Sequence, residues 1–254
     1  MKYDVMLCKM IAKKQLTADI FDLTVEAGEL AKAAQPGQFA HIYVPGKTLR
    51  RPISICGIDR AAETLRFVFQ IRGEGTARLA EMRPGDTLDI LAPLGNGFFL
   101  GNTGQRAVFV GGGIGVPPLL EAAKAFGKNA TVVAGFRNEA NIILKEDFEK
   151  NGNRVLIATD DGSYGHRGLV TDCLKELDFN VIFACGPTPM LKAVCRIAAL
   201  RKVPCQISLE ERMACGIGAC LGCACRLKKD GQEFYGHVCK DGPVFNYENV
   251  VWEG

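Results

Sequence analysis

The sequence has no long apolar run and no excess of charge of either sign. Its most apolar stretch, residues 107–120, is broken by three successive glycines and a Pro-Pro pair, whereas a membrane-spanning helix needs about 18 or more apolar residues in a row. The 31 basic and 28 acidic side chains give a net charge of +3, which is too balanced for a nucleic-acid-binding surface. Residues 1–14 lack the apolar core and cleavage site of a signal peptide. We therefore expect a cytoplasmic protein that contacts neither membrane nor nucleic acid.

Cysteine is too scarce for a secreted disulfide scaffold, yet it is unevenly distributed. The chain has 11 cysteines among 254 residues, an odd number and well below the roughly 8–10% of small disulfide-rich proteins. Five of them crowd into one C-terminal stretch: Cys215, Cys220, Cys223, Cys225 and Cys239. In a reducing compartment, such crowding indicates metal or cluster ligation rather than disulfides.

The spacing within this stretch is specific. Cys215, Cys220, Cys223 and Cys239 form the pattern C-x4-C-x2-C…C, which is typical of plant-type [2Fe–2S] sites. The intervening residues 216–219 are rich in glycine, so that backbone N–H groups can approach the cluster sulfurs and tune the reduction potential. Zinc held by four cysteines is the alternative, with ligand pairs usually two to four residues apart. The glycine-rich C-x4-C loop suits a cluster better.

Cys225 does not continue this spacing, because it lies only two residues beyond Cys223. We interpret it as a buried spectator thiol. We give the same interpretation to the cysteines that lie far from the cluster pattern: Cys8, Cys56, Cys173, Cys195 and Cys205.

The first hundred residues favour β-structure. Short β-rich runs are predicted at 20–25, 39–44, 53–58, 65–71 and 87–91, separated by turn signals such as Pro-Gly. One helix is expected at 76–82. Short, closely spaced strands of this kind predict a small antiparallel barrel.

The pattern changes after residue 104. Apolar strands at 107–110, 130–134, 154–158 and 181–185 alternate with helices at 117–126, 142–150, 169–177 and 188–200, and a last strand is expected at 205–209. This alternation predicts a doubly wound parallel α/β sheet. With no internal repeat and no linker, we expect three modules: a β-barrel at 1–100, an α/β domain at 101–209 and a small cluster-binding module at 210–254.

Two glycine turns follow strands of the α/β region. The first contains Gly111, Gly112, Gly113 and Gly115, and the second contains Cys185, Gly186 and Pro187. Turns at the same edge of a parallel sheet form the crevice where nucleotides bind, and a helix start there favours phosphate. The first turn departs from G-x-G-x-x-G, because Pro117-Pro118 stands where the third glycine is sought, and close packing of a tight turn is the alternative.

The barrel contains a third candidate anion site. In Gly73-Glu74-Gly75-Thr76 we expect Thr76 to be the N-cap of a helix and Gly75 to let a pyrophosphate approach its free N–H groups. Arg51 and Ser54 place a positive charge and a hydroxyl on a nearby strand. A solvated surface charge is the alternative for Arg51.

Together these motifs resemble the ferredoxin–NADP reductase superfamily. R-P-I-S at Arg51–Ser54 resembles its flavin motif, Gly75-Thr76 its flavin pyrophosphate site, and Cys185-Gly186-Pro187 its nicotinamide-side turn. With the cysteine pattern appended, the whole chain resembles the family of electron-transfer subunits of NAD-dependent (class 1B) dihydroorotate dehydrogenases. Residues 93–98 and 208–213 also match that family.

The resemblance implies three redox groups and their sites. FAD would lie in the barrel, on Arg51, Pro52, Ile53, Ser54, Val68, Phe69, Gln70, Gly75 and Thr76. The [2Fe–2S] cluster would be held by Cys215, Cys220, Cys223 and Cys239. NAD would act as co-substrate at Gly111, Gly112, Gly113, Gly115, Cys185, Gly186 and Pro187.

The resemblance also implies a partner and a route. A catalytic dihydroorotate dehydrogenase subunit carrying FMN would join this chain in a heterotetramer of two copies of each. Electrons from dihydroorotate oxidation, a step of pyrimidine biosynthesis, would pass from the FMN through the cluster and FAD to NAD. The chain's own task is then to space and tune redox groups, so we assign no catalytic acid or base, and no chemistry to the three histidines.

Two other functions remain open at this point. Related flavin–cluster subunits serve sulfide dehydrogenases, glutamate-synthase-like enzymes and hydrogenases, and no residue here touches those substrates. A zinc-stabilised nucleotide-binding or regulatory protein without redox turnover is a second alternative. The coenzyme is also open between NAD and NADP, because Arg137 follows the second α/β strand and could meet a 2′-phosphate.

Overall fold

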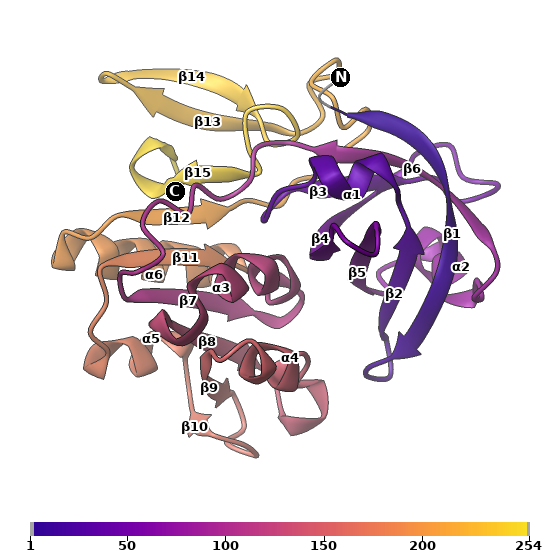
Figure 1. Cartoon of the computed structure of the whole chain (residues 1–254). Coiled ribbons are helices and arrows are strands. Elements are labelled where there is room, and N and C mark those ends of the chain that lie inside the picture. The colour runs from indigo at the N-terminus through magenta and orange to yellow at the C-terminus, as the bar shows by residue number, and fades with distance from the viewer. Residues whose placement is uncertain (1–2, 253–254) are drawn as a thin grey trace. The chain divides into compact units, whose positions relative to one another are not determined.

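The computed structural model describes residues 3–252, which fall into two compact units (Figure 1). The first unit contains the chain up to Gly97 together with Glu211–Cys225 and Gly236–Pro243. The second contains Phe98–Glu210, Arg226–Tyr235 and the chain from Val244 onward. The stretch expected as a cluster-binding module, 210–254, is therefore shared between the two units.

The first unit is built on a closed six-stranded barrel with the strand order β1-β2-β5-β4-β3-β6. All neighbouring strands pair antiparallel. The strands are β1 (Asp4–Gln15), β2 (Ile20–Glu26), β3 (Phe39–Ile42), β4 (Arg51–Asp59), β5 (Thr64–Gln70) and β6 (Thr87–Leu94). The predicted antiparallel barrel is confirmed.

The barrel core follows from strand alternation, because every second side chain of a strand points to the same face. Ala40 and Ile42 of β3 and Ile53 and Ile55 of β4 belong to the buried cluster inside the barrel. Strand β1 was not expected from the sequence. Most of its side chains are at least partly exposed, and its pairing with both β2 and β6 holds it in the barrel.

Two short helices join this unit, α1 (Glu29–Ala33) and α2 (Glu74–Glu81). Helix α2 corrects one prediction: Thr76 is not the N-cap. The N-cap is Gly73, and Thr76 lies in the first turn, where its hydroxyl accepts hydrogen bonds from the N–H groups of Arg72 (2.8 Å) and Gly73 (3.3 Å). Thr76 therefore fixes the start of the helix from inside the first turn.

The second unit contains a seven-stranded sheet in the order β10-β9-β8-β7-β11-β12-β15. Its strands are β7 (Ala107–Gly112), β8 (Ala130–Phe136), β9 (Arg154–Thr159), β10 (His166–Arg167), β11 (Val181–Cys185), β12 (Cys205–Ser208) and β15 (Val244–Asn246). All neighbouring pairs are parallel except β12–β15. The predicted parallel sheet is confirmed, and its last, antiparallel strand comes from the C-terminal stretch.

Four helices connect the parallel strands. They are α3 (Leu120–Phe126), α4 (Lys145–Lys150), α5 (Val170–Cys173) and α6 (Thr188–Arg201). The chain runs β7, β8, β9 in one direction and then returns through α5 to β11 on the other side of β7. Right-handed crossovers therefore place α3 and α4 on one face and α5 and α6 on the other, and the contacts α3–α4 and α5–α6 agree.

The return makes β7 and β11 neighbours at the point where the strand order reverses. Nucleotides bind at such switch points in doubly wound sheets. Aromatic rings fix the two strands together, since Phe109 of β7 stacks on Phe183 of β11 with centroids 4.8 Å apart. Phe126 of α3 meets Phe183 edge-on at 5.6 Å.

The C-terminal stretch also forms the hairpin β13 (Ala224–Lys229) and β14 (Gln232–His237). Sequence patterns did not indicate this hairpin. Among residues 3–252, no helix combines the length and apolar character that crossing a membrane requires.

Candidate functional site

The R-P-I-S motif lies on β4. Alternate side chains of this strand point to the outer face of the barrel. The β3–β4 register pairs Phe39 with Ser54 and His41 with Pro52. These four side chains share one face, because Ala40, Ile42 and Ile53 of the same strands lie in the barrel core. Pro52 and Ser54 are half-buried. The motif thus presents a ring and a hydroxyl on the outside of the barrel.

Arg51 and Gly75 are brought into direct contact. A Cβ placed on Gly75 would lie 2.5 Å from the guanidinium carbon of Arg51, which no real Cβ tolerates. Gly75 is in the first turn of α2, whose leading N–H groups have no partner within the helix. A fixed positive charge and a helix start therefore meet at one point, and both favour a bound phosphate.

The remaining predicted residues of the barrel differ in what they expose. The side chains of Ile53 and Phe69 are part of the core, and Phe69 stacks on Phe21 with centroids 6.0 Å apart, so only their backbones can face a cofactor. Val68 is buried but lies outside that core cluster. The Gln70 amide donates to Asp19 at 2.6 Å.

The four predicted ligand cysteines lie in the two C-terminal segments of the first unit. The thiols of Cys215 and Cys220 hydrogen-bond to each other, as do those of Cys223 and Cys239. The described residues hold no group of three or more His, Cys, Asp or Glu side chains arranged around a single metal ion. Two pairs of thiols are what a two-iron cluster takes, with two thiolates on each iron.

Backbone N–H groups of the loop point at the cysteine sulfurs. Gly218 donates to Sγ of Cys239 at 3.2 Å, and Ala219 and Cys220 donate to Sγ of Cys215 at 3.2 and 3.3 Å. Burial disfavours ionisation of Cys215, but donors from Cys220, Ile217 and Ala219 outweigh it and lower its pKa to about 6. A loop that stabilises thiolate at Cys215 suits an iron–sulfur cluster.

The thiol of Cys239 is less ready to ionise in the absence of a metal. Burial, followed by the neighbouring Cys223 thiol, raises the pKa of Cys239 to about 12. Burial also raises the pKa of Cys225 to about 11. Cys225 is only partly buried, whereas we expected a buried thiol, and the same holds for Cys173.

The segment after Cys239 is fastened to the end of β6. The side-chain amide of Asn96 donates to the carbonyls of Lys240 (3.1 Å) and Asp241 (2.9 Å), and its backbone N–H donates to Gly242 at 2.6 Å. A Cβ on Gly95 would lie 2.5 Å from Cδ of Pro243. The turn at 95–96 therefore positions the fourth cysteine against the barrel.

One residue without an expected role lies beside the cluster loop. The ring of His41 is fully buried, and a Cβ built on Gly216 would lie 2.8 Å from its Nδ1 atom. No local sequence signal reveals this contact, because β3 and the cluster loop are far apart along the chain.

The two glycine turns of the second unit meet at the switch point. The register pairs Gly111 of β7 with Cys185 of β11. A Cβ on Gly115 would lie 2.6 Å from the carbonyl carbon of Cys185, and one on Gly112 would lie 2.9 Å from Cδ of Pro187. Gly113 differs, since its Cβ position is open and its φ is +53°. Both predicted turns thus belong to one site.

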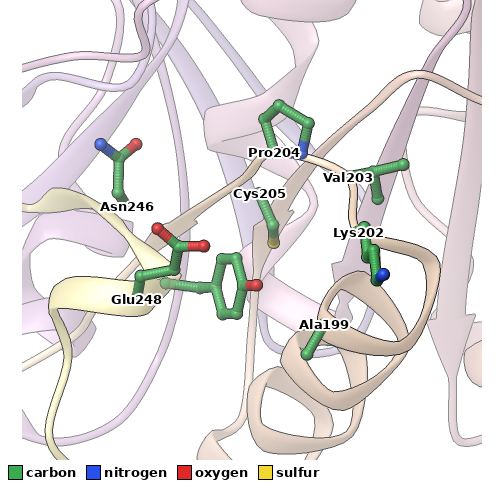
Figure 2. Close-up of a pocket in the computed structure, with 8 residues that line it drawn as sticks. Ala199, Lys202, Val203, Pro204, Cys205, Asn246 and Glu248 are labelled. Carbon is green, nitrogen blue, oxygen red and sulfur yellow. The ribbon is translucent and has the colours of Figure 1, made fainter.

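A separate hollow of about 470 Å³ in the second unit contains none of the predicted site residues (Figure 2). It lies at the end of α6, the start of β12 and the end of β15. The glycine turns follow the carboxyl ends of the parallel strands, so the hollow is at the opposite, amino ends of these strands. Its lining residues are Ala199, Lys202, Val203, Pro204, Cys205, Asn246, Tyr247 and Glu248.

Comparison with known proteins agrees with this geometry. The family model for the iron-sulfur cluster binding domain of dihydroorotate dehydrogenase B matches residues 210–251. A solved structure of an NADH-dependent reduced ferredoxin-NADP oxidoreductase, studied for flavin-based electron bifurcation, has a TM-score of 0.84 and 32% identity. The match covers 97% of this chain and 90% of that one. The expected iron–sulfur domain and flavin-reductase fold are confirmed.

Curated relatives match nearly end to end. The dihydroorotate dehydrogenase B (NAD(+)) electron transfer subunit of Geobacillus sp. (strain WCH70) is 43% identical over 252 residues, covering 95% of this chain and 96% of the relative. The same subunit of Bacillus caldolyticus is 44% identical with the same coverage. This chain therefore belongs to the family of electron transfer subunits of NAD(+)-dependent dihydroorotate dehydrogenase B.

Proposed function

We propose that this chain passes electrons from a catalytic dihydroorotate dehydrogenase subunit to NAD+. The barrel holds FAD, the four paired cysteines hold a [2Fe–2S] cluster, and the glycine turns of the second unit hold the nicotinamide coenzyme. When bound, the cluster carries single electrons, the flavin exchanges one or two, and NAD+ accepts a hydride. The chain's residues supply binding, orientation and shielding, and none acts as a general acid or base.

On the flavin side, two features of the barrel carry the proposal. Arg51 places its charge against Gly75, at the start of α2, where a pyrophosphate would also meet free N–H groups. Pro52 and Ser54 lie on the outer face of β4, half-buried, where a ring and a ribityl chain can be covered. We assign FAD to this face.

On the cluster side, the chain supplies two pairs of thiols and several N–H donors. Cys215 with Cys220 and Cys223 with Cys239 would each hold one iron. The N–H groups of Gly218 and Ala219 already point at ligand sulfurs. Such donors stabilise negative charge on the sulfurs and so raise the reduction potential.

On the nicotinamide side, the turns after β7 and β11 supply close backbone approach. The contacts of Gly112 and Gly115 with the second turn leave no room for larger residues there. The pyrophosphate of a dinucleotide would meet the open backbone at Gly113. We propose NAD rather than NADP, in line with the printed names of the relatives.

The observation that carries this function is the match to curated subunits over 95% of the chain at 43% identity. The test mixes this protein with the catalytic dihydroorotate dehydrogenase subunit and follows NADH formation from dihydroorotate, with each component alone as control. Activity in the mixture only is the expected result. If the mixture is inactive while NADH still bleaches the visible spectrum of this protein, the relay stands and the partner is wrong.

A second candidate function rests on the solved structure at 32% identity, an NADH-dependent reduced ferredoxin-NADP oxidoreductase. In that function the partner would exchange electrons with ferredoxin and NADPH. Replacing the dihydroorotate dehydrogenase subunit and dihydroorotate with a ferredoxin-oxidising partner subunit and reduced ferredoxin separates the two functions, because only one of the two mixtures should drive nicotinamide reduction.

The finer assembly is also a proposal. A catalytic partner is supported by the relatives being named subunits. FMN in that partner and a heterotetramer of two copies of each chain rest on the family resemblance alone. The cytoplasm is supported by the cysteines, all of which are free thiols in the structure. Size-exclusion chromatography with light scattering on the mixture measures the stoichiometry.

A further inference from the structure

His41 is the one histidine that the barrel buries completely. Its strand, β3, pairs it with Pro52 of the flavin motif, and its side chain lies on the same outer face as Pro52 and Ser54. The outer face of a barrel strand is ordinarily the wet one. Here the exposed fraction of His41 is 0%, so another part of the first unit covers it.

The cluster loop provides that cover. A Cβ on Gly216 would lie 2.8 Å from Nδ1 and 2.9 Å from Cε1 of His41. Gly216 follows the ligand Cys215 directly and has a φ of +72°, which only glycine adopts without strain. The imidazole therefore lies directly between the flavin strand and the loop that carries the first cysteine.

The ring itself lacks hydrogen-bond partners. Among the described residues neither Nδ1 nor Nε2 has a partner, although both atoms are buried. Phe39 meets the ring edge-on at 5.9 Å. Arg50 reaches His41 only at its backbone carbonyl oxygen, at 3.3 Å, and donates its other hydrogen bonds to Asp89. An unsatisfied N–H on a buried imidazole carries the full cost of its desolvation, so a bound group at this junction is the natural acceptor.

We infer that His41 is a positioning residue for the [2Fe–2S] cluster: it supports the cluster loop at Gly216 and donates a ring N–H to sulfur of the bound cluster. This inference rests on the proposed assignment of the cluster to Cys215, Cys220, Cys223 and Cys239. An added N–H donor stabilises the reduced, more negative cluster and so raises its reduction potential. Whether neutral or protonated, an imidazole has at least one N–H to donate.

The test measures the midpoint potential of the cluster by EPR-monitored redox titration. His41→Leu keeps bulk but removes the donor, and we expect it to disfavour cluster reduction about tenfold, which is about 59 mV for one electron. At least one of His41→Asn and His41→Gln, which keep an N–H, should return to within about threefold of wild type. The inference is overturned if the equilibrium constant for cluster reduction in His41→Leu stays within about twofold of wild type. Equal shifts in all three variants also overturn it.

Ile42→Val is the matched control, because Ile42 lies on the same strand but faces the barrel core. It loosens β3 without touching the ring, so we expect the cluster potential to stay unchanged. A shift equal to that of His41→Leu would mean that general loosening of the strand is responsible. If His41→Leu shifts the flavin potential and leaves the cluster potential unchanged, His41 serves FAD instead. Either result overturns the inference.

A second measurement decides the matter if His41→Leu takes up no cluster. Protein labelled with 15N-histidine is reduced, and pulsed EPR detects nitrogen coupled to the cluster. The three histidines are His41, His166 and His237. Nε2 of His237 is also buried and has no partner within residues 3–252. We expect the coupling in wild type and in His237→Gln, and its loss in His41→Gln. Coupling that is absent from wild type, or lost only in His237→Gln, overturns the inference.

Both measurements use the isolated chain and need neither the partner nor dihydroorotate. A negative mixing assay with a clear His41 effect removes the proposed partner alone. A positive mixing assay without any His41 effect removes the inference alone.

Discussion

The guanidinium of Arg51 occupies the space above Gly75 where any other residue would place its Cβ, with Cζ 2.5 Å from that position. The contact joins the first residue of β4 to the first turn of α2. Gly75 is therefore required for the position of a charged side chain rather than for an unusual backbone angle. This makes the flavin site testable without breaking the fold.

Gly75→Ala should weaken FAD binding without unfolding the barrel. The added methyl displaces the flexible end of Arg51, so the charged hydrogen bond to pyrophosphate is lost; we expect about a tenfold rise in the FAD dissociation constant, about 1.4 kcal/mol. Alanine favours helix over glycine by up to about 1 kcal/mol, so the stability of α2 does not fall. FAD titration of the flavin-free protein measures the affinity.

The control uses a double-mutant cycle. In an Arg51→Ala background the space above Gly75 is empty, so adding Gly75→Ala should cost little further affinity. An equal loss in both backgrounds would show that the methyl acts on the cofactor or on the helix itself, and not through Arg51.

Gly115→Ala should affect the stability and the nucleotide affinity of the second unit. Its new Cβ would meet backbone atoms, 2.6 Å from the carbonyl carbon of Cys185 and from Cα of Gly186, which cannot yield as a side chain can. We expect the two glycine turns to separate, at a cost of about 1–3 kcal/mol in unfolding free energy, with NADH affinity lowered at least about tenfold. Urea unfolding and NADH titration measure the two effects. FAD and iron content should be unchanged, and their loss would contradict an effect local to the switch point.

Cys223→Ser and Cys225→Ser form a matched pair two residues apart. Cys223 shares a hydrogen bond with the Cys239 thiol, so its loss removes one ligand and should remove most of the cluster's visible absorbance and iron. Cys225→Ser should retain both at wild-type levels, because Cys225 lies outside the C-x4-C-x2-C…C spacing of the ligands. Iron analysis and EPR of the reduced protein check the pair. Cluster loss in Cys225→Ser alone would reassign the ligands.

The sequence predicted the elements whose signals are local. The barrel strands β2 and β5 show alternation and turn residues, and the strands of the sheet show continuous apolar runs. Strand β1 could not be found this way, because only Cys8 and Met10 of this strand are buried in the core, with Met6 partly buried against it, while Leu7 is 72% exposed. Its position comes from backbone pairing to strands on both sides.

The same distinction between local signals and contacts of distant segments applies to the site. Cysteine spacing and glycine turns are short-range signals, so a candidate ligand set and candidate nucleotide turns can be proposed from the sequence, and both stay predictions. The three-residue strand β15 and the Asn96 contacts with residues 240–242 depend on segments distant along the chain. Thr76 illustrates a local error, since the residue expected to cap α2 from outside lies within its first turn. Side-chain chemistry alone could not distinguish the two positions.

The burial of His41 should also make the stability of the barrel depend on pH. In the chain without a bound cluster, burial, followed by the charge of Arg50, lowers the pKa of His41 from 6.5 to about 4. Above pH 6.5 the ring is neutral in both folded and unfolded chains. As the pH falls from 6.5 towards 4, only the unfolded chain takes up the proton, so the unfolding free energy decreases, by about 3 kcal/mol in full and about 1 kcal/mol between about pH 7.5 and about pH 5.5. In His41→Leu this part of the decrease should vanish, which urea unfolding of both proteins at the two pH values measures. Equal pH dependence in the two proteins would mean that His41 is protonated in the fold, and that the imidazole finds water or an acidic partner where the structure shows none among the described residues.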